Sequence, residues 1–117
     1  MNHANKNRTL GRTRSQRTAL LRGLAVSLIR DGQITTTLAK AKELQPQIER
    51  LVTHAKTDNV AARRHVARKL GEPTDSTIAK LFTEVAPKFV ERNGGYTRVI
   101  KLGQNSGRVE AVIAFVA

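Results

Sequence analysis

The sequence has no cysteine and no tryptophan, and aromatic residues make up only 3% of its 117 residues. Without cysteine, the chain has neither disulfides nor thiol-based metal or redox chemistry. Because rings are scarce, Leu, Ile, Val and Ala must fill the core. A protein that reads single-stranded nucleic acid needs several exposed rings for base stacking, and only Tyr96 is expected to be exposed.

Long apolar runs are also missing. The N-terminus is polar and basic, and no apolar run approaches the roughly 18 residues that a membrane span requires. We therefore expect a soluble, non-secreted protein with no membrane partner. At 117 residues the chain is long enough for one compact domain but short for two.

Acidic residues are few, and the first thirty positions contain none. The formal net charge is +12 and the sequence pI is about 11.4, which is typical of a chain with a polyanionic partner. Arg12, Arg14 and Arg17 cluster at or before the start of a predicted helix, where the macrodipole disfavours cations. Arginine predominates among these early cations, and its planar fork favours bidentate contacts. Together these features indicate phosphate as the partner.

Residues 1–11 have Leu10 as their only sizeable aliphatic side chain besides Met1, so they cannot bury enough surface to order themselves. We predict a basic N-terminal arm over residues 1–11 and a single domain over residues 12–117. The first predicted helix spans residues 15–30, with Leu24 near the centre of an apolar arc. The full arc is Leu20, Leu21, Leu24, Ala25 and Leu28.

The rest of the chain alternates periodic segments with breaks. Asp31-Gly32 predicts a turn, residues 33–36 a strand, and Thr37 the cap of a helix that ends near His54 or Lys56. Pro46 lies within that helix and predicts a kink or a late start. We expect further helices at about 60–70 and from about 75 to a stop at 93–95, then strands at 96–102 and 109–116 joined by a loop at 103–108.

This order, α-β-α-α-α-β-β, predicts a small two-layer α/β (α+β) domain with a three-stranded sheet.

Catalytic signals are weak throughout. His3, His54 and His65 lack the three- to five-residue spacing of a helical metal pair. The aspartates lie at turns or helix starts, where capping explains them, and no glycine pattern matches a phosphate loop. We therefore expect no enzyme activity, metal, cofactor or small-molecule substrate.

Basic residues without stacking rings favour recognition of folded RNA by its shape and backbone. One alternative is a sequence-tolerant architectural DNA-binding protein, which equal competition by duplex DNA would reveal. Another is a basic adaptor for acidic proteins or membrane surfaces, although the chain has few apolar anchors for that role.

Two stretches carry a family resemblance. Residues 34–44, ITTTLAKAKEL, and residues 94–98, GGYTR, resemble the signature stretches of bacterial large-subunit ribosomal protein seventeen. The similarity continues through residues 12–17, 55–58, 80–82 and 86–87, and so covers nearly the whole chain.

This resemblance implies a structural protein of the large ribosomal subunit that binds large-subunit rRNA near the polypeptide exit tunnel. Its other expected partners are neighbouring large-subunit proteins. The resemblance implies rRNA contact by His3, Lys6, Arg8, Arg12, Arg14, Arg17, Arg22, Arg63, Arg64, Tyr96, Thr97 and Arg98.

Overall fold

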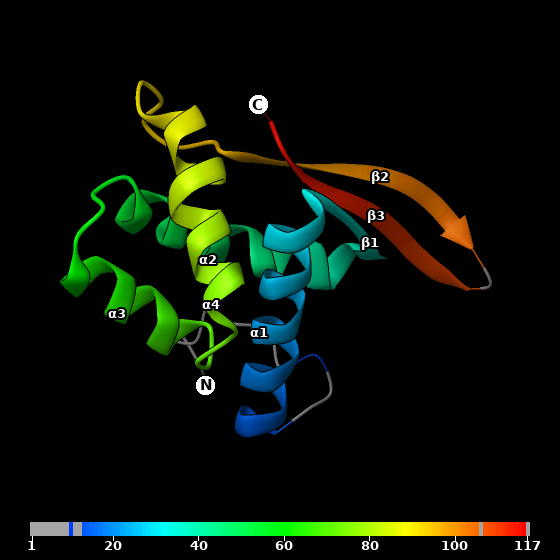
Figure 1. The fold of residues 1–117 in the computed structure, drawn as a ribbon. Coiled ribbons are helices and arrows are strands. Elements are labelled where there is room, and N and C mark those ends of the chain that lie inside the picture. The colour runs from blue at the N-terminus through cyan, green and yellow to red at the C-terminus, as the bar shows by residue number, and fades with distance from the viewer. Residues whose placement is uncertain (1–9, 11–12, 106, 117) are drawn as a thin grey trace, which may run out of the picture.

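The computed structural model describes residues 10, 13–105 and 107–116. The domain has the predicted element order and is a mixed α/β fold with a three-stranded sheet (Figure 1). In chain order the elements are α1 (Arg14–Asp31), β1 (Gln33–Thr37), α2 (Leu38–Ala55), α3 (Val60–Lys69), α4 (Asp75–Lys80), η1 (Leu81–Val85), η2 (Ala86–Phe89), β2 (Thr97–Asn105) and β3 (Arg108–Phe115).

The sheet is antiparallel throughout, in the order β1-β3-β2. Ile113 on the central strand β3 pairs with Ile34 on one side and Val99 on the other, and its side chain is fully buried. Helix α2 packs against β2 and β3 and forms the second layer. Figure 1 shows the hairpin of β2 and β3 extending away from the helical body.

Helix α1 begins and ends as capping chemistry predicts. Thr13 and Gln16 form a reciprocal capping box, and Gly32 adopts the left-handed conformation at φ 82° and donates its N–H to the carbonyl of Leu28. The predicted apolar arc is confirmed at Leu21, Ala25 and Leu28, which are buried. Leu20 and Leu24 are only half-buried, and Ile29 is fully buried although it was not predicted. The helix packs against α2, β1 and α4 together, so its buried face is rotated from the one that periodicity alone suggested.

Helix α2 is capped by Thr37, whose hydroxyl accepts from the backbone N–H of Lys40, and it ends at Ala55 as predicted. The late start expected from Pro46 is wrong, because the helix runs through this exposed proline. An internal proline costs about 3 kcal/mol. Burial on both sides of it offsets this cost, through Ala41, Leu44, Ile48, Leu51, Val52 and Ala55.

The segment after Thr74 departs from a single helix. The α-helical turns of α4 pass into a π turn, in which Ala86 donates to the carbonyl of Leu81, and then into a 3-10 turn. Pro87 lies in that last turn, where its missing N–H and bulky ring disfavour a regular α-helix. The apolar side chains of this segment are nevertheless buried, through Ile78, Leu81, Phe82, Val85 and Phe89.

The hairpin is longer than predicted. A bulge between Lys101 and Gly103 shifts the register of the ladder without ending it, so Gly103 pairs with Glu110 and the strands continue to Asn105 and from Arg108. Gly103 has a φ of 93°, a conformation that a side chain would strain. The expected loop at 103–108 is therefore mostly strand.

Candidate nucleic-acid interface

The positive charge is left largely uncompensated. All nine acidic residues lie in the described part of the chain, yet only two ion pairs form there, Arg30 with Asp31 and Arg63 with Asp58. The hydrogen bonds from these arginines hold the pKa of Asp31 and of Asp58 below its ordinary value. Most of the described Lys and Arg side chains therefore have no ion pair with a described acidic residue.

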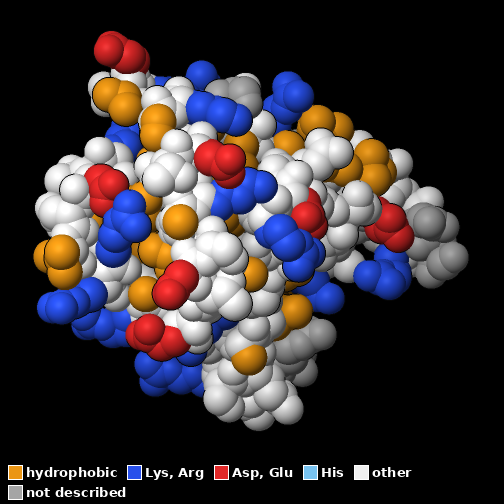
Figure 2. All heavy atoms as spheres, in the orientation of Figure 1, with side chains coloured by type: hydrophobic (Ala, Val, Ile, Leu, Met, Phe, Trp, Pro, Cys, Tyr) orange, Lys and Arg blue, Asp and Glu red, His pale blue; other side chains and the backbone are white. Residues whose placement is uncertain are grey.

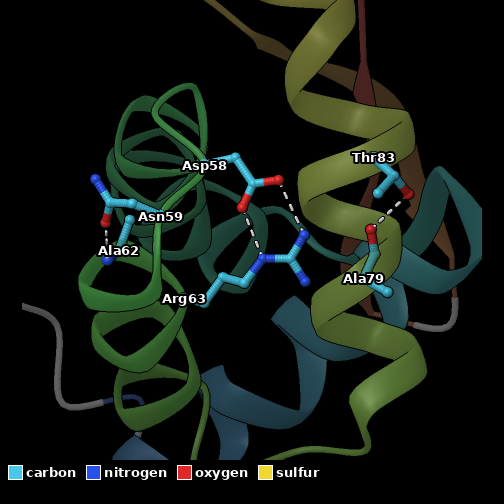
Figure 3. Close-up of polar contacts among 6 residues, drawn as sticks. All are labelled: Asp58, Asn59, Ala62, Arg63, Ala79 and Thr83. Carbon is cyan, nitrogen blue, oxygen red and sulfur yellow. Dashed lines mark hydrogen bonds and ion pairs between the residues drawn. The ribbon is translucent and has the colours of Figure 1, made fainter.

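Arg63 is occupied within the fold. Its Nε and Nη2 donate to Oδ1 and Oδ2 of Asp58 at 2.7 and 3.0 Å, as Figure 3 shows. Its guanidinium also lies over the ring of Phe82, 5.0 Å from the ring centroid. Arg64, the next residue, is exposed and has no ion pair with any described residue. Of these two predicted contacts, Arg64 is the one that points its charge outward.

Arg22 joins α1 to the end of α3. Its Nε donates to the carbonyl of Lys69 at 3.2 Å and its Nη2 to that of Arg68 at 3.4 Å. A cation at this position suits the negative end of the α3 dipole. Gly71, at φ 79°, leaves room for the side chain, since a Cβ there would lie 3.0 Å from Cδ of Arg22. The guanidinium is thus fixed by its surroundings.

Arg22 also borders three neighbouring hollows of the surface. One lies at the start of α1, where Thr13 and Arg14 line it, and has a volume of about 510 Å³. Another lies between α1, α2 and α3, has a volume of about 400 Å³, and is bordered by Arg50 and Lys69. We refer to Arg14, Arg22, Arg50 and Lys69 as the basic trough.

The structure brings His54 of α2 against His65 of α3. Their ring centroids are 4.3 Å apart with the ring planes inclined at 50°. Burial, the nearby imidazole of His54 and the positive charges of Lys69 and Arg68 all lower the pKa of His65. No spacing signal in the sequence indicates this pair, because the two histidines lie on different helices. Only the way α2 folds back against α3 places them together.

Tyr96 is buried, so the expectation that it is exposed is wrong. Its hydroxyl is 3.2 Å from the hydroxyl of Thr53, the ammonium of Lys56 lies 4.7 Å from its ring centroid, and Phe89 packs at 5.2 Å between centroids. Hydrogen bonds with Lys56 and Thr53 lower the pKa of Tyr96. The ring joins α2, η2 and the start of β2, and it offers no platform for an external base.

Thr97 is likewise buried and is hydrogen-bonded to α2. Its Oγ1 and N–H donate to Oε2 of Glu49 at 2.8 and 3.3 Å, and its carbonyl accepts from Nε2 of Gln45 at 3.1 Å. Stretch 94–98 therefore clasps β2 to α2, and only Arg98 among its predicted contact residues is exposed.

The predicted contact residues do not form one compact site. Arg14, Arg17 and Arg22 share α1, whereas Arg98 lies on β2, away from the start of α1 (Figure 1). Figure 2 shows Lys and Arg side chains gathered at the lower left, over α3. Sequence reasoning missed Arg50, Lys69 and the histidine pair. The remaining predicted residues, His3, Lys6, Arg8 and Arg12, lie outside the described residues.

Other kinds of site are not evident in the described ranges. No group of three or more His, Cys, Asp or Glu side chains there could hold a metal ion. None of the helices formed by these residues is both long and apolar enough to cross a membrane.

Comparisons with known proteins agree with one another. The family model described as Ribosomal protein L17 matches residues 20–116. The large ribosomal subunit protein bL17 of Campylobacter jejuni serotype O:23/36 is 47% identical over 119 residues, which cover 100% of both chains. Its counterpart in Sphingopyxis alaskensis is 46% identical over 118 residues, covering 99% of this chain and 84% of that protein. The Campylobacter concisus counterpart is 52% identical over 101 residues, covering 86% and 84%.

Proposed function

The chain belongs to the Ribosomal protein L17 family, and from this premise we propose that it binds large-subunit rRNA near the polypeptide exit tunnel through contacts of its basic arm and helices with phosphates. As a member of that family it is a structural constituent of the large subunit of the cytoplasmic ribosome, not an enzyme. It associates there with rRNA and with other ribosomal proteins.

The observation that carries the proposal is the uncompensated charge. The chain has 21 basic and nine acidic residues, and its described part forms only two ion pairs. Folded rRNA is a dense array of phosphates that carries condensed counterions. When Lys and Arg side chains neutralise these phosphates, the counterions are released, and this release favours binding. Phosphate contacts of this kind fix position and orientation without reading sequence.

The proposed contacts fall into three groups. The arm supplies His3, Lys6 and Arg8, and Arg12 follows directly after it. Helices α1 and α3 supply Arg14, Arg17, Arg22 and Arg64, and β2 supplies Arg98. We assign Arg63, Tyr96 and Thr97 to positioning of these elements, because their side chains are engaged inside the protein.

Crosslinking within intact large subunits tests both the partner and the place. Ultraviolet irradiation of subunits that carry the tagged chain is expected to link it to rRNA nucleotides around the tunnel exit. Crosslinks confined to nucleotides far from the exit would overturn the location. If duplex DNA displaces isolated rRNA equally well at equal phosphate concentration, the architectural DNA-binding alternative is the better account.

Truncation tests the contribution of the arm. Leu10 packs against the hydrophobic core, so the truncation is limited to residues 2–9, which include Lys6 and Arg8. We expect the thermal midpoint of the free protein to stay within about 2 °C, because residues 2–9 contain no sizeable aliphatic side chain to bury. The affinity for large-subunit rRNA and its salt dependence should both fall.

As a control, Lys6→Gln with Arg8→Gln keeps the chain length and should reproduce most of the loss of affinity. Unchanged affinity in both variants, or a large drop in the thermal midpoint of the truncated chain, would contradict the proposed role of the arm.

A further inference from the structure

The hollow between α1, α2 and α3 combines an apolar floor with a cationic rim. Leu21, Leu51 and Leu70 form its floor and are each no more than 6% exposed. Arg22, Arg50 and Lys69 stand around it, and none of the described residues that line it is acidic. Its volume of about 400 Å³ is within the range of roughly 300–1,000 Å³ that small-ligand sites occupy.

The histidine pair gives this hollow planar surfaces. Phe82, Phe89 and Tyr96 are buried, whereas His54 is exposed and His65 is half-buried, and both imidazoles line the hollow. RNA-binding proteins receive unstacked bases on rings of this kind, histidine included, and on arginine planes. A bare phosphate would make no use of the apolar floor, and an apolar side chain would make no use of the cations.

From this combination we propose that the hollow receives a single unstacked nucleotide of rRNA, with its base against the imidazoles of His54 and His65 and its phosphates beside Arg22, Arg50 and Lys69. This inference rests on the proposed rRNA binding and adds to it a base contact that phosphate neutralisation does not require. The cationic rim disfavours a basic segment of a neighbouring ribosomal protein.

The site is preorganised for such a ligand. Arg22 is held by the carbonyls of Arg68 and Lys69, so little side-chain freedom is lost when its outer N–H groups meet a phosphate. Arg50 is exposed and has no ion pair with any described residue, so no internal pair must break when it binds.

Replacing both rings tests the base contact. His54→Ala with His65→Ala is expected to weaken binding of the full chain to large-subunit rRNA about tenfold, the scale of one base stacked on a ring. The slope of affinity against salt should stay the same, since no cation is removed. Chemical probing of the bound rRNA should show that one nucleotide loses base protection while neighbouring backbone protection remains.

Two further variants keep the test decisive. His54→Phe with His65→Phe retains the planar surfaces and should bind within about twofold of the original chain, with the same protected nucleotide. Arg50→Gln leaves the rings and the core untouched, and it should lower the salt slope by about 0.7 to 0.9, the share of one phosphate contact. Thermal unfolding of each variant confirms that it is folded.

The outcomes separate this inference from the proposed function. If the original chain binds rRNA with a steep salt dependence but the double alanine variant gives the same affinity and footprint, the nucleotide site is wrong and the proposed function stands. If the original chain does not bind large-subunit rRNA at all, the proposed function fails and this inference fails with it.

Discussion

At the scale of residues, similar side chains have different tasks according to their partners. Arg63 and Arg64 are adjacent and chemically identical, yet Arg63 holds Asp58 and lies over Phe82, whereas Arg64 is exposed and has no ion pair among the described residues. An exposed unpaired cation contributes little to folding but much to binding a polyanion. A paired cation adds a modest stabilising contact to the fold and has less charge left for an external anion.

This contrast yields a matched pair of substitutions. Arg64→Gln is expected to weaken rRNA binding and to lower the salt slope by about 0.7 to 0.9, while the thermal midpoint stays unchanged. Arg63→Gln is expected to lower the thermal midpoint, because Asp58 and Phe82 lose their partner, with less effect on affinity than Arg64→Gln. Filter binding and thermal unfolding measure both effects, and the reverse order would contradict these assignments.

Prediction from sequence is uneven at this scale. Capping roles were predictable, because Thr37 precedes a periodic apolar run and its hydroxyl is the group that such a position needs. The burial of Tyr96 was not, since a tyrosine at the start of a strand suits either side of a sheet. Its environment depends on Thr53 and Phe89, which come from other elements of the chain. The contact between His54 and His65 could not be predicted for the same reason, because the two residues lie on different helices.

At the scale of elements, the clasp between α2 and β2 fixes the sheet against the helices. Glu49 accepts two hydrogen bonds from Thr97, and Gln45 donates one to the carbonyl of the same residue. These bonds end the glycine-rich turn and orient β2, which leaves Arg98 on the exposed side. A stretch that resembles a family signature is therefore explained largely by folding.

Thr97→Val tests this clasp. The change keeps the side-chain shape but removes the hydroxyl that donates to the Glu49 carboxylate at 2.8 Å. Loss of a hydrogen bond to a charged group is expected to destabilise the domain by about 1 to 2 kcal/mol. The matched control is Thr35→Val on the edge strand β1, where Thr35 is exposed, and it should change stability by less than about 0.5 kcal/mol. If urea unfolding shows the same loss of stability in both variants, the hydrogen bonds between Thr97 and Glu49 do not stabilise the domain beyond the effect of an exposed Thr→Val change.

The elements themselves were largely predictable, because hydrophobic periodicity and turn residues agree along most of the chain. The exceptions are places where local signals compete with packing. Pro46 indicated a break, but buried residues on both sides keep α2 continuous. The bulge before Gly103 extends a hairpin whose glycines suggested a loop, and the sequence alone does not show which glycine ends a strand.

At the scale of the whole molecule, different residues are responsible for folding and for binding: apolar side chains form the core, and surface cations are proposed to bind the rRNA. The core consists of aliphatic and a few aromatic side chains, and it is complete without the unpaired cations. Those cations occur on α1, α2, α3 and β2, so they form a distributed surface, with the basic trough as its most structured part. Composition predicted the polyanionic partner, whereas the arrangement of the trough required the packing of three helices.

The salt dependence of rRNA binding tests this account most directly. The affinity of the full chain for large-subunit rRNA is measured from about 50 to 200 mM monovalent salt, and its logarithm is plotted against that of the salt concentration. If the four cations of the basic trough contact phosphates, the slope should be about −3 or steeper, because each contact contributes roughly −0.7 to −0.9. A slope between zero and about −1 would contradict the claim that unpaired cations hold the rRNA.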